Sequence, residues 1–133
     1  MASRPAVSSG ANRTSGVPLK MGLQAHRAIL VTSWNENALS TARAKAIEVL
    51  ASEGFGYDAM VTPVVHGIVN GYGTFIIVPD GSKLGWPQAI AADEARESFL
   101  LWLRSQDLVD YAYVQYGGYR DGISAQLLAS SDN

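Results

Sequence analysis

The residue types best suited to chemistry lie mid-chain, in "VNGYGTFIIVPDGSKLGW" at residues 69–86. Glycines beside exposed aromatic rings are typical of RNA-recognition sheets, where bases stack on the rings. In "NGYGTF", however, Thr74 stands before the second aromatic residue, so strand alternation sends Tyr72 and Phe75 to opposite faces. The leading position, which is basic in that motif, is Asn70. The stretch therefore favours a β-hairpin over an RNA-binding surface.

The turn "PDGSK" that follows places Lys83 directly after Gly81 and Ser82. Turn amides next to a lysine can hold a phosphate group. The spacing does not match the Gly-x-x-x-x-Gly-Lys of a P-loop, so a nucleotide site of that type is excluded. We interpret the stretch as a solvated turn and keep phosphate binding as the alternative.

The sequence offers little for catalysis. It has no cysteine, which excludes disulfides, thiolate metal sites and cysteine nucleophiles. His66 is expected in the core opposite Phe75, where packing explains it better than ligation. The acids in predicted loops or at strand ends are Asp80, Asp107, Asp110 and Asp121. Nothing obliges two of them to share a cleft, as an acid–base pair must. We therefore expect no enzyme activity, catalytic residue, cofactor or metal.

A tyrosine-rich segment, "YAYVQYGGYRDG", lies near the end of the chain. Alternation places Tyr111 and Tyr113 on one face as packing residues and Tyr116 on the other. Tyrosine and arginine are enriched at protein interfaces and on surfaces that stack nucleobases. The candidates for an interface or ligand site across the whole chain are Tyr72, Lys83, Tyr116, Tyr119 and Arg120.

Periodicity predicts the elements that position these residues. The order is β-α-β-β-α-β, which indicates a ferredoxin-like α+β fold with two helices on one face of a four-stranded antiparallel sheet. Asn35 or Asn37 caps the first helix, and Gly54 suits the left-handed position after its end. The tail from residue 123 either adds an edge strand or frays. The expected ranges are strand 27–34, helix 35–55, two strands within 60–79, helix 87–107 and strand 110–118.

The two middle strands form a hairpin around Asn70 and Gly71, the strongest turn signal in the chain. With a two-residue turn, His66 pairs with Phe75. Pro63 lacks an N–H group, which makes the first of these strands an edge strand.

This register gives the hairpin two apolar faces. One face holds Val64, His66, Ile68, Phe75 and Ile77, and the other holds Val61, Val65, Val69, Tyr72, Ile76 and Val78. The helices cover one face only. We expect the other to meet the N-terminal segment, a second copy of the chain or a ligand.

Length and charge limit the remaining possibilities. The chain has 133 residues, which we divide into a flexible or partner-ordered arm, 1–25, and a single domain, 26–133. The arm contains Arg4, Arg13 and Lys20 without an acid, but the net charge of the chain is -2, which disfavours nucleic acid as the partner. No run is long and apolar enough for a membrane span, and the arm lacks the apolar core of a secretory signal.

The motifs "TPVV", "VNGY", "PDGSK" with "GW", "FLLWL" and "VQYG" together resemble a loose group of small uncharacterised proteins of tailed bacteriophages. The resemblance covers residues 29–117. It implies a phage origin and an accessory role, and it implies no catalytic residue.

We therefore expect a non-enzymatic phage accessory protein in the host cytoplasm. It would bind a host or phage macromolecule, a protein or its own second copy, through an apolar sheet face and the tyrosine-rich end. One alternative is a virion structural or decoration protein anchored by the arm. Another is a protein that sequesters a nucleotide or signal molecule at a dimer seam, using Lys83, Tyr116 and Arg120.

Overall fold

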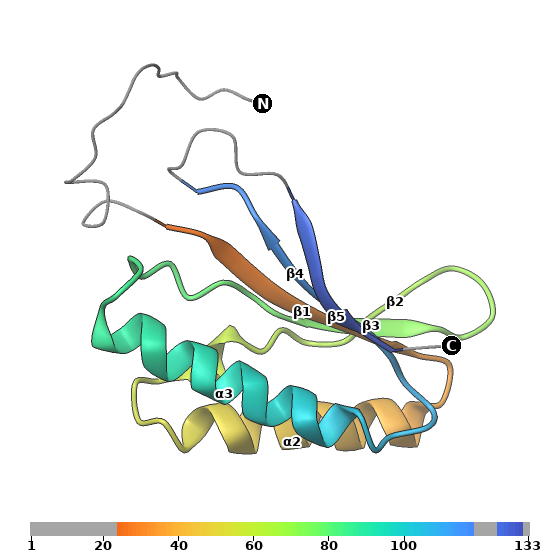
Figure 1. Cartoon of the computed structure of the whole chain (residues 1–133). Helices are drawn as coiled ribbons and strands as arrows, with labels where there is room; N and C mark the ends of the chain where they lie inside the picture. The colour runs from red at the N-terminus through yellow and green to blue at the C-terminus, as the bar shows by residue number, and fades with distance from the viewer. Residues whose placement is uncertain (1–23, 119–124, 132–133) are drawn as a thin grey trace.

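The computed structural model describes residues 24–118 and 125–131, in which two helices cover one face of an antiparallel sheet (Figure 1). The α+β class is as expected. The helices are α2, Glu36–Ala51, and α3, Pro87–Leu103, with the short 3-10 helix η2, Tyr57–Met60, between them in sequence. The strands are β1 His26–Ser33, β2 Val65–His66, β3 Gly73–Ile77, β4 Asp110–Tyr116 and β5 Gln126–Ser130.

The sheet has five strands rather than four, in the order β2-β3-β1-β4-β5. The additional strand is β5, because the tail pairs with β4 instead of fraying. β2 lies at the opposite edge, as Pro63 predicted. No helix in the described part of the chain is both long and apolar enough to cross a membrane.

β1 is the central strand, bonded to β3 on one side and β4 on the other. Its alternation buries Ile29 and Val31 completely beneath the helices. Ile29 faces Ile77 of β3 and Tyr113 of β4, so the core is built across three strands.

The helices begin where local signals place them. Asn35, not Asn37, caps α2: its Oδ1 accepts a hydrogen bond from the Ala38 N–H at 2.9 Å. Gly54 has φ +84°, as expected after a helix end. Pro87 occupies the first turn of α3, where its missing N–H costs nothing. The fully or nearly buried residues of the two helices include Leu39, Ala42, Ala46, Leu50, Ala92, Ala95, Phe99 and Leu103.

The hairpin register differs from the prediction by two residues. His66 lies opposite Gly73, and the Gly67 N–H donates to the Tyr72 carbonyl at 2.9 Å. Asn70 and Gly71 are left-handed as predicted, with φ of 63° and 69°, but they lie within a longer loop. His66 is consequently exposed at the edge of the sheet and is not a core residue.

This register is set at the end of the hairpin far from the turn. The Thr62 N–H donates to the Ile76 carbonyl, and the Ile76 N–H donates to Thr62 Oγ1. Val61 then lies opposite Ile77. Because Ile77 points toward the helices, Val61 is also buried in the core. The prediction that Val61 lies on the face away from Ile77 is therefore wrong.

Candidate functional site

The face of the sheet that the helices leave bare is the first candidate site. Leu30 lies at its centre, opposite Ile76 on one side and Ala112 on the other. Val114 and Leu127 continue the face toward β5, and Val65 continues it toward β2. Leu30 is 36% exposed, Leu127 63% and Val65 69%. We call the outward side chains of these strands the open face.

The open face carries almost no charge. On the described strands it has no lysine, arginine or glutamate, and its histidine and aspartate, His26 and Asp110, lie at opposite ends of the sheet. The hydroxyls of Thr32 and Thr74, 2.8 Å apart, form a hydrogen bond with each other. Such a surface is suited to the apolar surface of a protein and poorly suited to phosphate groups.

The structure does not bring the predicted site residues together. Tyr116 pairs with His26 at the start of β1, and their rings lie 5.5 Å apart. Tyr72 precedes Gly73, which pairs with Ser33 at the other end of β1. Tyr72 and Tyr116 therefore lie at opposite ends of the sheet.

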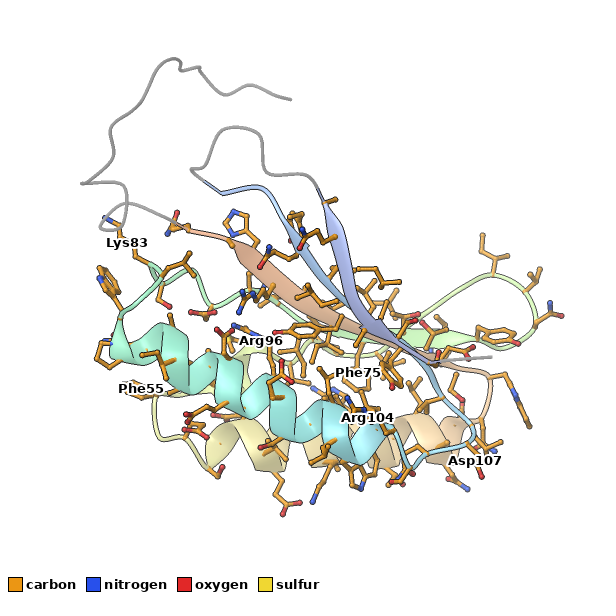
Figure 2. The ribbon with its side chains drawn as sticks, in the orientation of Figure 1. Phe55, Phe75, Lys83, Arg96, Arg104 and Asp107 are labelled. Atoms are coloured by element: carbon orange, nitrogen blue, oxygen red, sulfur yellow. The ribbon has the colours of Figure 1, made fainter. Side chains whose placement is uncertain are left out.

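Lys83 lies at the same end as Tyr116. It follows β3 in the loop before α3, and its Nζ is 5.7 Å from the centre of the Trp86 ring (Figure 2). The loop is tied to the start of β1, since Gln24 Nε2 donates to the Gly81 carbonyl at 2.8 Å. The remaining two candidates, Tyr119 and Arg120, lie outside the described residues.

A second feature, which the sequence did not indicate, is a partly buried ion-pair cluster between α3 and the sheet (Figure 2). Arg96 is only 2% exposed, and its Nη2 donates to Asp80 Oδ1 and Asp93 Oδ1, each at 2.9 Å. Asp93 also accepts a hydrogen bond from Arg27 Nη1 at 2.8 Å. The cluster therefore joins the loop before α3, the helix itself and β1.

Hydrogen bonding favours the charged forms of Asp80 and Arg96. Burial alone would raise the pKa of Asp80, but hydrogen bonds from Ser82 and Arg96 outweigh it and the pKa is lowered. Burial would likewise lower the pKa of Arg96, yet the hydrogen bonds with Asp93 and Asp80 raise it. The only local signal for this arrangement was the i,i+3 spacing of Asp93 and Arg96 on α3.

The lowered pKa of Asp80 predicts sensitivity to acid. A carboxyl group with a depressed folded-state pKa stabilises the fold above its unfolded value, here 3.8, and loses that contribution as the pH falls through the lower folded value. We expect the free energy of unfolding, measured with urea between pH 7 and pH 2, to fall less steeply on acidification for Asp80→Asn. Equal slopes for the variant and the parent protein would contradict this prediction.

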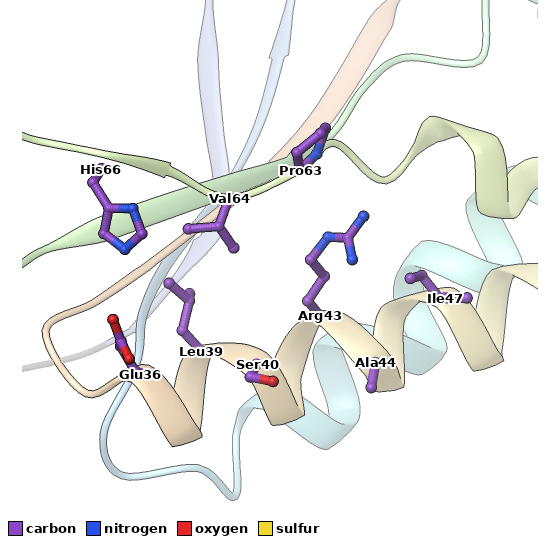
Figure 3. Close-up of a pocket in the computed structure, with 9 residues that line it drawn as sticks. All are labelled: Glu36, Leu39, Ser40, Arg43, Ala44, Ile47, Pro63, Val64 and His66. Carbon is purple, nitrogen blue, oxygen red and sulfur yellow. The ribbon is translucent and has the colours of Figure 1, made fainter.

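A third feature is an open groove of about 490 Å³ between α2 and the β2 edge (Figure 3). Its floor is largely apolar, and Arg43 lies across it with Nε donating to the Thr62 carbonyl at 2.8 Å. His66 and Glu36 lie toward one end. No hydrogen bond or ion pair joins His66, Glu36 or Arg43 to another of the three, so the groove holds no assembled acid–base set. The groove is lined by Glu36, Leu39, Ser40, Arg43, Ala44, Ile47, Pro63, Val64 and His66.

Within residues 24–118 and 125–131, no group of three or more histidine, aspartate or glutamate side chains is placed to hold a metal ion. No protein-family model matches the chain, and neither a curated protein nor a solved structure matches it significantly. Function is therefore inferred from the geometry of the described residues.

Proposed function

We propose that the protein is a non-enzymatic accessory protein of a tailed bacteriophage that binds another protein through its open face. The observation that carries the proposal is the uncharged apolar strip running through Leu30, Ile76, Val114 and Leu127. An antiparallel sheet normally turns polar residues toward water on the side that no helix covers. Here that side is apolar, which is typical of the buried centre of a protein interface.

The charge pattern favours a protein over nucleic acid as the partner. Binding to the phosphate backbone requires lysine and arginine side chains that displace counterions. The strand residues of the open face supply none, and the whole chain has a net charge of -2. The expected partner surface is apolar and uncharged at its centre.

We further infer that the fold is ferredoxin-like with one added strand. The order β2-β3-β1-β4 and the two helices on one face are those of a βαββαβ unit, and β5 extends it beyond β4. In this arrangement one sheet face is left free by the connectivity itself.

One observation favours a second function, the binding of a nucleotide or signal molecule. Lys83 and Tyr116 lie at the same end of the sheet, where a cation and an aromatic ring are available to a phosphate and a base.

The virion alternative depends on residues 1–25, of which the structure describes only Gln24 and Ala25. An accessory protein that binds another protein would act in the host cytoplasm, whereas a structural or decoration protein would be located in the virion.

The proposal is tested by placing a photo-crosslinking amino acid at Leu30 in one sample and at Leu101 in another. Leu101 is an equally apolar control, 63% exposed on α3 away from the open face. In infected cells we expect one discrete protein adduct from position 30 and none from position 101. An ionised carboxylate introduced by Ile76→Asp should weaken this complex by about a hundredfold or more, because it is buried without a counter-charge. Identical adducts from both positions, or none from position 30, would overturn the proposal.

A further inference from the structure

The two edges of the sheet differ in how they are protected against pairing with another strand. β2 has two residues and follows Pro63, which are common means of blunting an exposed edge. β5 has five residues, "QLLAS", and the stretch 125–131 contains no proline, glycine or charge. One irregularity, a register shift opposite Tyr113 and Val114, interrupts its pairing with β4 near Leu128. In the described part of the chain no strand pairs with the outer side of β5. Within the described residues the β5 edge is therefore the less protected of the two.

The backbone of β5 shows which groups are available. The Ser131 N–H donates to the Tyr111 carbonyl at 2.9 Å, and Ala129 lies opposite Tyr113. Bonded residues alternate along an antiparallel ladder, so the N–H and carbonyl of Ser130 point away from β4. Ser130 is also exposed. It offers one donor and one acceptor to an incoming strand.

We propose that β5 pairs antiparallel with β5 of a second copy of the chain about a two-fold axis. In such a pairing each residue meets its own type or a near neighbour, so a charged strand would oppose like charges. β5 has no charge to repel its copy. It does have Leu127 and Leu128, 63% and 40% exposed, to pack across the junction. Ser130 and Leu127 are the residues whose backbone groups point away from β4, so Ser130 of one copy faces Leu127 of the other and Leu128 lies beside the axis.

This dimer makes one continuous sheet from two five-stranded sheets. Leu127 lies on the open face, opposite Val114, so the two open faces meet at the β5 junction. The dimer thereby presents two binding surfaces side by side, which raises the avidity for a repetitive or dimeric partner. The pairing of β5 does not depend on whether the open face binds a protein.

The dimer is expected to depend on concentration. A five-residue strand is roughly 17 Å long at about 3.4 Å per residue. A strand pair of this length buries less than the roughly 1,200–2,000 Å² of a stable interface. We expect a monomer–dimer equilibrium in the micromolar range, measurable by sedimentation of the full chain from about 1 to 500 µM.

The decisive variant is Ser130→Pro, which removes the outward N–H and leaves the inward bonds to β4 in place. Ser130→Ala keeps the N–H and is the matched control. We expect Ser130→Pro to weaken the dimer by about tenfold or more, because the symmetric dimer loses one hydrogen bond from each copy. Ser130→Ala should leave it unchanged. A parent chain that is monomeric at every concentration, or a Ser130→Pro dimer as tight as the parent, would overturn the inference.

A charge exchange at Leu128 tests the same pairing without proline. Leu128→Lys and Leu128→Glu should each be monomeric alone, because like charges lie close to each other across the axis, and should form a heterodimer when mixed. Failure of the mixture to associate refutes the β5 pairing. Leu30→Asp separates this inference from the proposed function, since it changes the open face only. If Leu30→Asp dissociates the dimer and Ser130→Pro does not, the copies meet through their open faces instead.

Discussion

Replacing Arg96 with leucine should lower the free energy of unfolding by about 3–5 kcal/mol, the usual cost of removing one partner from a buried ion pair. The variant leaves the carboxylates of Asp80 and Asp93 without their shared donor at 2.9 Å. The Asp80 side chain is only 10% exposed, so water cannot fully replace the lost contact. The loop before α3 then loses the ion pair between Asp80 and Arg96 that joins it to the helix.

The measurement is urea unfolding at pH 7, with Arg104→Leu as the matched control. Arg104 follows α3 directly, is exposed, and forms no ion pair within the described residues, so the control should change stability by less than about 0.5 kcal/mol (Figure 2). Adding Asp80→Asn to Arg96→Leu should recover part of the loss, because one uncompensated charge is removed. A stable Arg96→Leu variant would show that the cluster contributes no net stability.

Replacing Phe75 with alanine should also cost about 3–5 kcal/mol, the range for emptying a fully buried aromatic site. Phe75 is completely buried between the sheet and the helices. Its neighbour Ile76 points to the open face and is only partly buried, so Ile76→Ala should cost about 1 kcal/mol.

The same unfolding experiment at low protein concentration compares the two variants. The difference between adjacent residues of β3 reports directly which face of the sheet is covered. Equal losses for Phe75→Ala and Ile76→Ala would mean that the open face is covered in the isolated protein, which would remove the main support for the proposed interface.

Several features were predictable because they depend on residues close together in the sequence. The cap at Asn35, the helix start at Pro87 and the left-handed backbone at Asn70 and Gly71 all follow from local conformational preferences. Alternation alone also separated Tyr113, which is buried, from Tyr116, which is exposed. These local signals determined the α+β class, the helices and the central strand.

The candidate site was only partly predictable. The sequence indicated that one sheet face would lie bare, because two helices cannot cover both faces of an apolar hairpin. It grouped Tyr72 with Tyr116, although these lie at opposite ends of β1, since strand pairing rather than residue type decides which ends meet.

What only the tertiary structure decided depends on contacts between distant residues. Thr62 and Ile76 set the hairpin register from the end away from the turn, which moved His66 to the surface and Val61 to the core. The tail forms β5 because it pairs with the free edge of β4. Asp80 contacts Arg96 because the chain brings the loop before α3 against the helix, where both side chains are largely buried. The sequence of each segment determines its own conformational preference. Strand register, edge pairing and buried charge pairs depend on which segments compete for the same partner, and this is decided only when the whole chain folds.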